Sequence, residues 1–174
     1  IPAGAGLIPA ANITPRDKTA NTSTTLLSAS TTLTLLNVPA KRNLEISGFI
    51  GRLSAPSELN LRFNGDTANN YTGNITLNSG TRSNYANNPT CNLTSTPIQA
   101  TSTLHGTIIN TTSSPKVFYM GVVSATSSAT VASFTEGNCI WHNGTSRITS
   151  IELSWGGTIT APAESYLTLY ASDD

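Results

Sequence analysis

Hydrophobic and polar residues alternate along most of the chain, in short runs bounded by glycine, proline, asparagine or serine. Alternation with a period of two is typical of a β-strand with one buried face. In LEISGFIGRL, for example, Leu44 and Ile46 fall on one side, and Glu45 and Ser47 fall on the other. The pattern predicts strands over residues 24–38, 44–53, 58–64, 71–77, 104–110, 116–124, 130–134, 147–154 and 165–171.

Turn-forming residues separate these strands, and helical periodicity is nearly absent. Pro39 fixes a bend before one strand, and Asn64-Gly65 supplies positive φ after another. Residues 79–97 are predicted to form a long polar loop. Many short strands with regular turn signals predict an all-β fold, a single antiparallel β-sandwich and, more specifically, a jelly roll.

The first fifteen residues, IPAGAGLIPAANITP, break the alternation. They hold three prolines and no charged residue, which favours an extended path over a helix. We therefore expect an extended N-terminal arm over residues 1–18, followed by a jelly-roll domain over residues 19–174. Fifteen extended residues reach nearly 50 Å at about 3.3 Å each, which is more than one domain width.

The arm has four bulky apolar side chains, and the sequence offers no partner for them within the arm itself. Exposed strand edges of a sandwich invite pairing with another chain. We expect Ile1, Leu7, Ile8 and Ile13 to contact a neighbouring subunit, by strand addition in the manner of donor-strand pilins. The alternatives are that the arm packs on its own domain or is a frayed terminus.

Composition excludes several classes of function. Nine basic and nine acidic residues cancel, so the chain has no basic surface for nucleic acid or an anionic membrane. Thr, Ser and Asn number 28, 21 and 17, so hydroxyls and amides solvate the surface in place of charges. A net charge near zero does little to oppose self-association. Apolar runs such as VFYMGVV (117–123) are too short to span a bilayer, and we expect no membrane insertion.

The chain has two cysteines, Cys91 and Cys139. In a secreted protein a lone pair most simply forms one disulfide, which the chain-entropy model values at about 4 kcal/mol for a loop of this length. The alternative is two buried free thiols.

Candidate catalytic groups are sparse. The histidines, aspartates and glutamates are scattered, and no G-x-S-x-G motif is present. We expect no enzyme activity, no metal site and no cofactor. Trp141 and Trp155 are candidates for contact with a glycan, since jelly rolls often serve as lectins. Two tryptophans in a β-sandwich are more often core or interface anchors, which is the alternative interpretation.

A separate prediction is that sugars are covalently attached to the chain. The sequon Asn-x-Ser/Thr marks acceptor sites for N-glycosylation in secreted proteins. Most of the sequons here fall in predicted loops or at strand ends. Their asparagines are Asn12, Asn21, Asn70, Asn74, Asn92, Asn110 and Asn143.

Three segments carry a resemblance to a known group of proteins: VPAKRNLEISGFI, LNLRFNGDTANNYTG and RITSIELSWGGTITAPAESYLTLYA. They resemble jelly-roll structural proteins of tailed phages, in an aliphatic-Pro-Ala bend, an Arg-Phe-Asn-Gly-Asp turn and a closing pair of strands. These elements sit at residues 38–40, 62–66, 148–151 and 165–170, and the resemblance covers about residues 21–171. The chain departs from it in lacking a Gly after Tyr170 and in having its cysteine pair and sequons.

These observations together predict an extracellular structural subunit that is glycosylated and assembles with itself. The arm of one copy would insert into the next, giving a head-to-tail homopolymer at a cell or virion surface. The resemblance implies the alternative of a phage decoration, tail or fibre protein that binds host glycans. A free lectin is the third interpretation.

Overall fold

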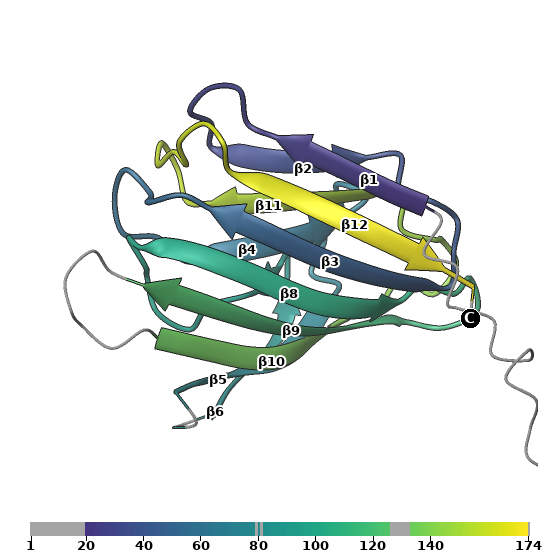
Figure 1. Cartoon of the computed structure of the whole chain (residues 1–174). Coiled ribbons are helices and arrows are strands. Elements are labelled where there is room, and N and C mark those ends of the chain that lie inside the picture. Colours follow the sequence, from purple (N-terminus) through teal and green to yellow (C-terminus); the bar gives the residue numbers. More distant parts are fainter. Residues whose placement is uncertain (1–19, 79, 81, 126–132, 174) are drawn as a thin grey trace, which may run out of the picture.

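The computed structural model describes residues 20–78, 80, 82–125 and 133–173, which form two antiparallel β-sheets packed face to face (Figure 1). The prediction of an all-β, sandwich-like fold is confirmed. The larger sheet has the strand order β1-β12-β3-β8-β9-β10-β5-β6, and the smaller has the order β2-β11-β4-β7. The strands are β1 (Ala20–Thr25), β2 (Thr32–Leu36), β3 (Asn43–Ile50), β4 (Leu59–Phe63), β5 (Tyr71–Leu77), β6 (Arg82–Asn88), β7 (Cys91–Asn92), β8 (Thr101–Ile109), β9 (Lys116–Ala125), β10 (Ser133–Trp141), β11 (Ser150–Trp155) and β12 (Tyr166–Ser172).

Eight of these strands pair like the two legs of one long hairpin, and we call them the ribbon. β1 pairs with β12, β2 with β11, β3 with β8 and β4 with β7, so the first four strands meet the last four in reverse order. The pairings β12–β3 and β11–β4 then set successive segments of the ribbon side by side. At its open end, Ala20 of β1 lies opposite Ala171 of β12.

Two insertions into the ribbon enlarge one sheet, and we call their four strands the extension. β5 and β6 are inserted between β4 and β7, and β9 and β10 between β8 and β11. β9 pairs with β8 of the ribbon, and β10 pairs with β5, which joins the two insertions. The extension therefore doubles the larger sheet from four strands to eight.

Aliphatic side chains fill the space between the sheets of the ribbon. In β3 and β8 every second residue is buried, as the alternation in the sequence predicts. On the smaller sheet, Leu33, Leu153 and Leu61 lie in one row across β2, β11 and β4, and all are buried. Each such side chain contributes about 1.5–3 kcal/mol on burial. A slip of one residue would expose the row, so the hydrophobic pattern fixes the register.

Most of the predicted strands are present with shifted ends. The strand predicted over residues 71–77 coincides with β5, whereas the one predicted over 24–38 is divided into β1 and β2. The positive φ expected at Asn64-Gly65 is confirmed, with values of 53° and 65°. The described residues contain no helix of the length and apolarity that a membrane crossing requires.

Two predictions of secondary structure are wrong. Residues 79–97 are not one long loop, because they contain β6 and β7. The strand predicted over 130–134 ends too early, because β10 runs from Ser133 to Trp141, and residues 130–132 lie outside the described residues. β6 is an edge strand with largely exposed side chains, so it needs no apolar face. β10 includes Glu136, Gly137 and Asn138, which are typical of loops.

Candidate functional site

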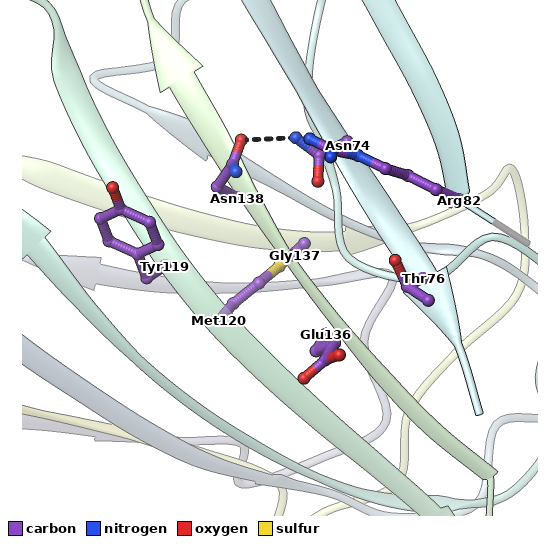
Figure 2. A pocket seen from close by; sticks show the side chains of 8 residues that line it. All are labelled: Asn74, Thr76, Arg82, Tyr119, Met120, Glu136, Gly137 and Asn138. Carbon is purple, nitrogen blue, oxygen red and sulfur yellow. Dashed lines mark hydrogen bonds between the residues drawn. The ribbon is translucent and has the colours of Figure 1, made fainter. Parts of the chain in front are cut away.

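An open hollow lies on the outer face of the extension, which is the face turned away from the four-stranded sheet (Figure 2). Its volume is about 430 Å³, within the range of roughly 300–1,000 Å³ found for small-molecule sites. All four strands of the extension contribute to it. The lining residues are Asn74, Thr76, Arg82, Tyr119, Met120, Glu136, Gly137 and Asn138.

The strand register places the polar lining residues in two adjacent rows. One row is Tyr119, Asn138 and Asn74, across β9, β10 and β5. The next row is Glu136, Thr76 and Arg82, across β10, β5 and β6. Neighbouring strands lie about 4.8 Å apart, so each row is about 10 Å wide. Both rows are therefore within reach of a single small ligand.

Asn74 and Asn138 orient one another at the centre of the hollow. The Nδ2 of Asn74 donates a hydrogen bond of 3.0 Å to the Oδ1 of Asn138, drawn as the dashed line in Figure 2. An amide has two N–H donors and one carbonyl acceptor. This bond therefore leaves the Oδ1 of Asn74 and the Nδ2 of Asn138 available to a ligand.

The backbone beneath these amides is tightly packed. A Cβ added to Gly137 would lie 2.1 Å from the carbonyl oxygen of Asn74, so β10 can approach β5 this closely only with glycine there. The two amides are thus mounted on paired strands and not on loops, which gives them fixed positions before any ligand binds.

Arg82 and Glu136 give the hollow one charge of each sign, with Thr76 between them in the row. In Figure 2 the Arg82 side chain extends from β6 toward Asn74. The ion pairs found among the described residues, Lys41–Asp173 and Arg62–Glu152, lie elsewhere. The hollow is therefore neutral in sum and contains both charged donors and charged acceptors.

Tyr119 presents an aromatic ring at the border of the hollow. Its side chain is 57% exposed, and it neighbours Asn138 across β9 and β10. A tyrosine ring combines an apolar face with a polar tip. This combination suits a ligand that has both C–H faces and hydroxyl groups.

A second feature of the outer face is a line of apolar side chains, which we call the aromatic row: Tyr166, Phe49, Val123 and Phe134. They are in register across β12, β3, β9 and β10, with Thr103 of β8 in the middle. The rings of Phe49 and Tyr166 stack with their centroids 6.0 Å apart. Tyr166, Val123 and Phe134 are exposed to solvent.

Beneath the hollow, an aromatic cluster fastens the extension to the ribbon. Phe63 of β4 contacts Tyr71 of β5, Phe118 of β9 and Trp141 of β10, with ring centroids 5.7 to 6.3 Å apart. The backbone N–H of Phe63 donates to the hydroxyl oxygen of Tyr71 at 2.9 Å. Burial raises the pKa of Tyr71 to about 12, so its hydroxyl stays protonated at neutral pH.

The predicted disulfide between Cys91 and Cys139 is confirmed, and it joins β7 of the ribbon to β10 of the extension. Asp66 makes a second link on the same side, because its carboxylate accepts the indole Nε1–H of Trp141 at 2.7 Å. Partial burial would raise the pKa of Asp66. Hydrogen bonds from Asn70, Trp141 and the backbone of Ala68 favour the charged form more strongly, so the pKa is lowered.

Lys116 is fully buried and fixes the loop that follows β10. Its Nζ donates to the carbonyl oxygens of Ser114 at 3.1 Å and Asn143 at 2.9 Å, and it lies 5.7 Å from the centre of the Trp141 ring. Burial lowers the pKa of Lys116, because the charged form has lost its water. The lysine ties Asn143 to the aromatic cluster.

The structure corrects the expectation that Trp141 and Trp155 contact a glycan. Trp141 is 0% exposed and Trp155 is 3% exposed, so neither offers a ring face to a ligand. Their indole N–H groups are also occupied, by Asp66 and by the carbonyl oxygen of Ser30. Both tryptophans are core anchors, which is the alternative interpretation of the sequence.

The sequons differ in how far the fold exposes them. The prediction that Asn110 carries a sugar is wrong for the folded protein, because its side chain is 0% exposed. Its Nδ2 donates to the carbonyl oxygen of Lys41, and its Oδ1 accepts the backbone N–H of Ile148. A sugar on the Nδ2 of Asn110 has no space at this buried site, and moving the side chain outward would leave the buried backbone N–H of Ile148 without its acceptor.

In three further sequons, the asparagine or the threonine makes a hydrogen bond within the fold. The Nδ2 of Asn70 donates to Asp66, and the Nδ2 of Asn74 donates to Asn138. The sequon of Asn92 has its threonine, Thr94, buried in a hydrogen bond with the backbone N–H of Leu59. In none of these is the sequon free of structural contacts.

Asn143 is different, because its sequon lies in the irregular segment between β10 and β11. Its Oδ1 accepts hydrogen bonds from the backbone N–H of Thr145 at 3.3 Å and from the hydroxyl of the same threonine at 3.2 Å. Within the described part of the chain, its Nδ2 has no acceptor. The nitrogen that would carry a sugar is therefore unoccupied and held next to the sequon hydroxyl.

The arm, with Ile1, Leu7, Ile8, Ile13 and the sequon at Asn12, lies outside the described residues, as does the side chain of Asn21. Sequence reasoning missed the hollow, although it named Asn74 as a sequon. The lining residues come from four strands whose pairing brings together distant segments, and no local pattern reveals that. The one signal that the sequence offered was Tyr119, a large aromatic residue within the strand predicted over residues 116–124.

Among the described residues, no group of three or more His, Cys, Asp or Glu side chains could hold a metal ion. Comparison of the chain with protein-family models, with curated proteins and with solved structures finds no match.

Proposed function

We propose that this protein is a structural subunit of an extracellular, glycosylated filament, in which the arm of one copy lies on the next copy. The observation that carries the proposal is the aromatic row, an exposed apolar surface on a chain without net charge. Exposed apolar patches of this kind mark interaction sites. The proposed occupant is the arm of a second copy, which has no charged residue before Arg16.

The position of the row favours a head-to-tail order. The arm joins β1 at Ala20, whereas Thr25, at the other end of β1, is in line with the aromatic row through its partner Tyr166. These two ends are about 17 Å apart at roughly 3.3 Å per strand residue. Copies stacked end to end would each offer the row to a neighbour's arm. Such a contact does not close on itself and so produces a filament.

The dimensions are compatible with this arrangement. The row crosses from β12 to β10, a width of about 19 Å at 4.8 Å between neighbouring strands. About six extended residues cover that width, and the arm is three times as long. The spare length would bridge the gap between two copies.

We also propose that the ribbon is a jelly roll. A long hairpin whose strands pair in reverse order and then wrap side by side is what a fold of two Greek keys produces. This favours a second candidate function, a phage decoration, tail or fibre protein, since the motifs that resemble tailed-phage jelly rolls lie in or beside β3, β4, β11 and β12 of the ribbon.

The proposed glycosylation is assigned to Asn143, on the geometry of its Nδ2 and the Thr145 hydroxyl. The protein would be secreted from an N-glycosylating host and its mass measured before and after enzymatic deglycosylation. Asn143→Gln and Thr145→Ala should each remove the mass shift, and Thr145→Ser should retain it. An unshifted mass of the unsubstituted protein, or sugar found only elsewhere, would overturn the assignment.

Electron microscopy of negatively stained, purified protein tests the assembly. Filaments are expected from the full chain and monomers from a chain without residues 1–15. Val123→Lys places a charge in the aromatic row and should also give monomers, whereas Thr107→Lys, exposed on the same sheet face outside the row, should leave filaments intact. Filaments that persist without the arm, or a full chain that is monomeric by light scattering, would refute the proposal.

Mixing experiments sharpen the test. A chain without its arm still has the aromatic row, and Val123→Lys still has its arm. Each should cap one end of a growing filament and shorten it in proportion to the amount added. An arm that packs on its own domain would give no capping by either variant.

A further inference from the structure

We propose that the hollow on the outer face of the extension binds a neutral saccharide. The inference is independent of the filament, because none of the residues that line the hollow belongs to the aromatic row. It rests on four observations: a neutral balance of charge, a fixed pair of amides, an exposed aromatic ring and a volume suited to a small ligand.

The charges argue for a ligand without net charge. A phosphate or carboxylate attracted by Arg82 would lie near Glu136, and a cation attracted by Glu136 would lie near Arg82, since the two are separated only by Thr76. A polyhydroxylated ligand avoids this conflict. Each hydroxyl both donates and accepts, so it can donate to Glu136 and accept from Arg82 at the same time.

The amides supply the next contacts. The Oδ1 of Asn74 accepts and the Nδ2 of Asn138 donates, and their mutual hydrogen bond of 3.0 Å holds both in place. A donor and an acceptor at a fixed spacing match two adjacent hydroxyl groups on a sugar ring. Because these side chains stand on paired strands, little ordering entropy is lost on binding.

Tyr119 completes the site. A sugar ring has hydroxyls around its edge and C–H groups on its faces, and the exposed ring of Tyr119 offers an apolar surface to such a face. Figure 2 shows Tyr119 and Arg82 on opposite sides of the asparagine pair. A ligand resting on the asparagines would therefore reach the tyrosine with one end and the arginine with the other.

The sequence offers a different occupant for the hollow, a sugar attached to Asn74. Asn74 is the asparagine of a sequon, and Thr76, the threonine of the same sequon, also lines the hollow. A sugar covalently attached to Asn74 would fill the hollow and exclude any other ligand. The hydrogen bond from Asn74 to Asn138 opposes this attachment. Mass analysis of the peptide that contains Asn74 decides between the two.

Calorimetric titration of the full chain with a panel of sugars tests the proposal. The panel comprises glucose, galactose, mannose, N-acetylglucosamine and the disaccharides cellobiose and lactose, with glucose 6-phosphate and glucosamine as charged counterparts. Saturable binding of at least one neutral sugar is expected, with its charged counterpart weaker.

Two substitutions and a matched control locate the binding. Tyr119→Ala and Asn138→Ala should each weaken the affinity about tenfold or more, which corresponds to the loss of roughly 1.4 kcal/mol. Tyr166→Ala removes an exposed aromatic ring from the same sheet face outside the hollow and should leave the affinity unchanged. Circular dichroism confirms that each variant is folded.

Three outcomes would overturn the inference. One is the absence of saturable binding by every neutral sugar in the panel. Another is an equal loss of affinity in Tyr119→Ala and Tyr166→Ala, which would place the sugar elsewhere on the face. The third is an attached sugar on Asn74. None of these depends on whether filaments form.

Discussion

The ribbon and the extension differ in how they are held together. Aliphatic rows between the two sheets stabilise the ribbon, and its register follows from hydrophobic alternation. The extension depends on an aromatic cluster around Phe63, on the Cys91–Cys139 disulfide and on the hydrogen bond from Trp141 to Asp66. The ribbon is thus stabilised mainly by aliphatic packing between its two sheets, and the extension by its pairing with β8 together with a few specific anchors.

Because of this arrangement, the residues that stabilise the ribbon are distinct from those that form the candidate ligand site. The extension is inserted at two points of the ribbon, and the candidate ligand site is made of extension residues alone. Its outer face can therefore change its side chains without disturbing the ribbon core. The specific anchors are the places where that independence can be tested.

Trp141→Ala should be the most damaging substitution in the extension. It removes the largest side chain of the aromatic cluster and leaves the Asp66 carboxylate without its indole donor. Loss of a buried tryptophan costs about 3–5 kcal/mol, and we expect the upper end. Urea unfolding measures the total, and hydrogen exchange locates it. Amides of β5 and β10 should lose protection before those of β3 and β12, whereas uniform loss would show that the two regions unfold as one unit.

Removing the disulfide is expected to have the next largest effect. Replacing Cys91 and Cys139 together with alanine should lower the free energy of unfolding by about 4 kcal/mol, because the unfolded chain regains the freedom of a long loop. Reduction of the unsubstituted protein should give a similar value in urea unfolding. A loss below about 1 kcal/mol would mean that the aromatic cluster and the pairing of β8 with β9 hold the extension without the disulfide.

Tyr71→Phe should cost about 1–3 kcal/mol, because the buried backbone N–H of Phe63 loses its acceptor. It should also alter stability at high pH. The phenol has its pKa raised to about 12, against 10.0 when unfolded, so its contribution is present below pH 10 and is lost as the pH rises toward 12. Thermal unfolding from pH 8 to 11.5 should show a shallower decline in the variant, and identical slopes would contradict the assignment.

Asp66→Asn should have the smallest effect, about 1 kcal/mol at neutral pH, because the amide oxygen can still accept one hydrogen bond. The pKa of Asp66 is lowered in the fold, so its contribution is present above pH 4 and is lost as the pH falls through the folded value. The variant should therefore lose less stability than the unsubstituted protein between pH 5 and 2. Chemical unfolding at fixed pH values measures this, with Glu58→Gln as a solvent-exposed control.

The sequence predicts strands with clear alternation in both regions, including β5 and β9 of the extension, and it misses one strand of each region, β6 of the extension and β7 of the ribbon. Strands such as β3 and β11 have clear alternation, and the Asn64-Gly65 turn has the residues that its positive φ requires. β6 has no apolar face, and β7 is too short for any periodic signal. Propensity therefore fails where a strand is paired at an edge or held by a disulfide.

The candidate site could not be predicted from local sequence patterns, because it is formed by strands that are distant in the chain. Asn74 meets Asn138 through the pairing of β5 with β10, which are more than sixty residues apart in the chain. The tryptophans illustrate the opposite case, since their polar sequence context makes them candidates for a surface contact although both are buried. Both Trp141 and Trp155 alternate inward on their strands, with their indole nitrogens paired.

The closeness of Ala20 and Ala171 across β1 and β12 has a practical consequence. Facing residues of an antiparallel pair are about 5 Å apart, so a short glycine-rich linker could join these two positions. New chain ends could then be opened in the exposed turn at Gly156 and Gly157. Such a circular permutant would keep both sheets while moving the attachment point of any leading segment to the opposite pole of the molecule.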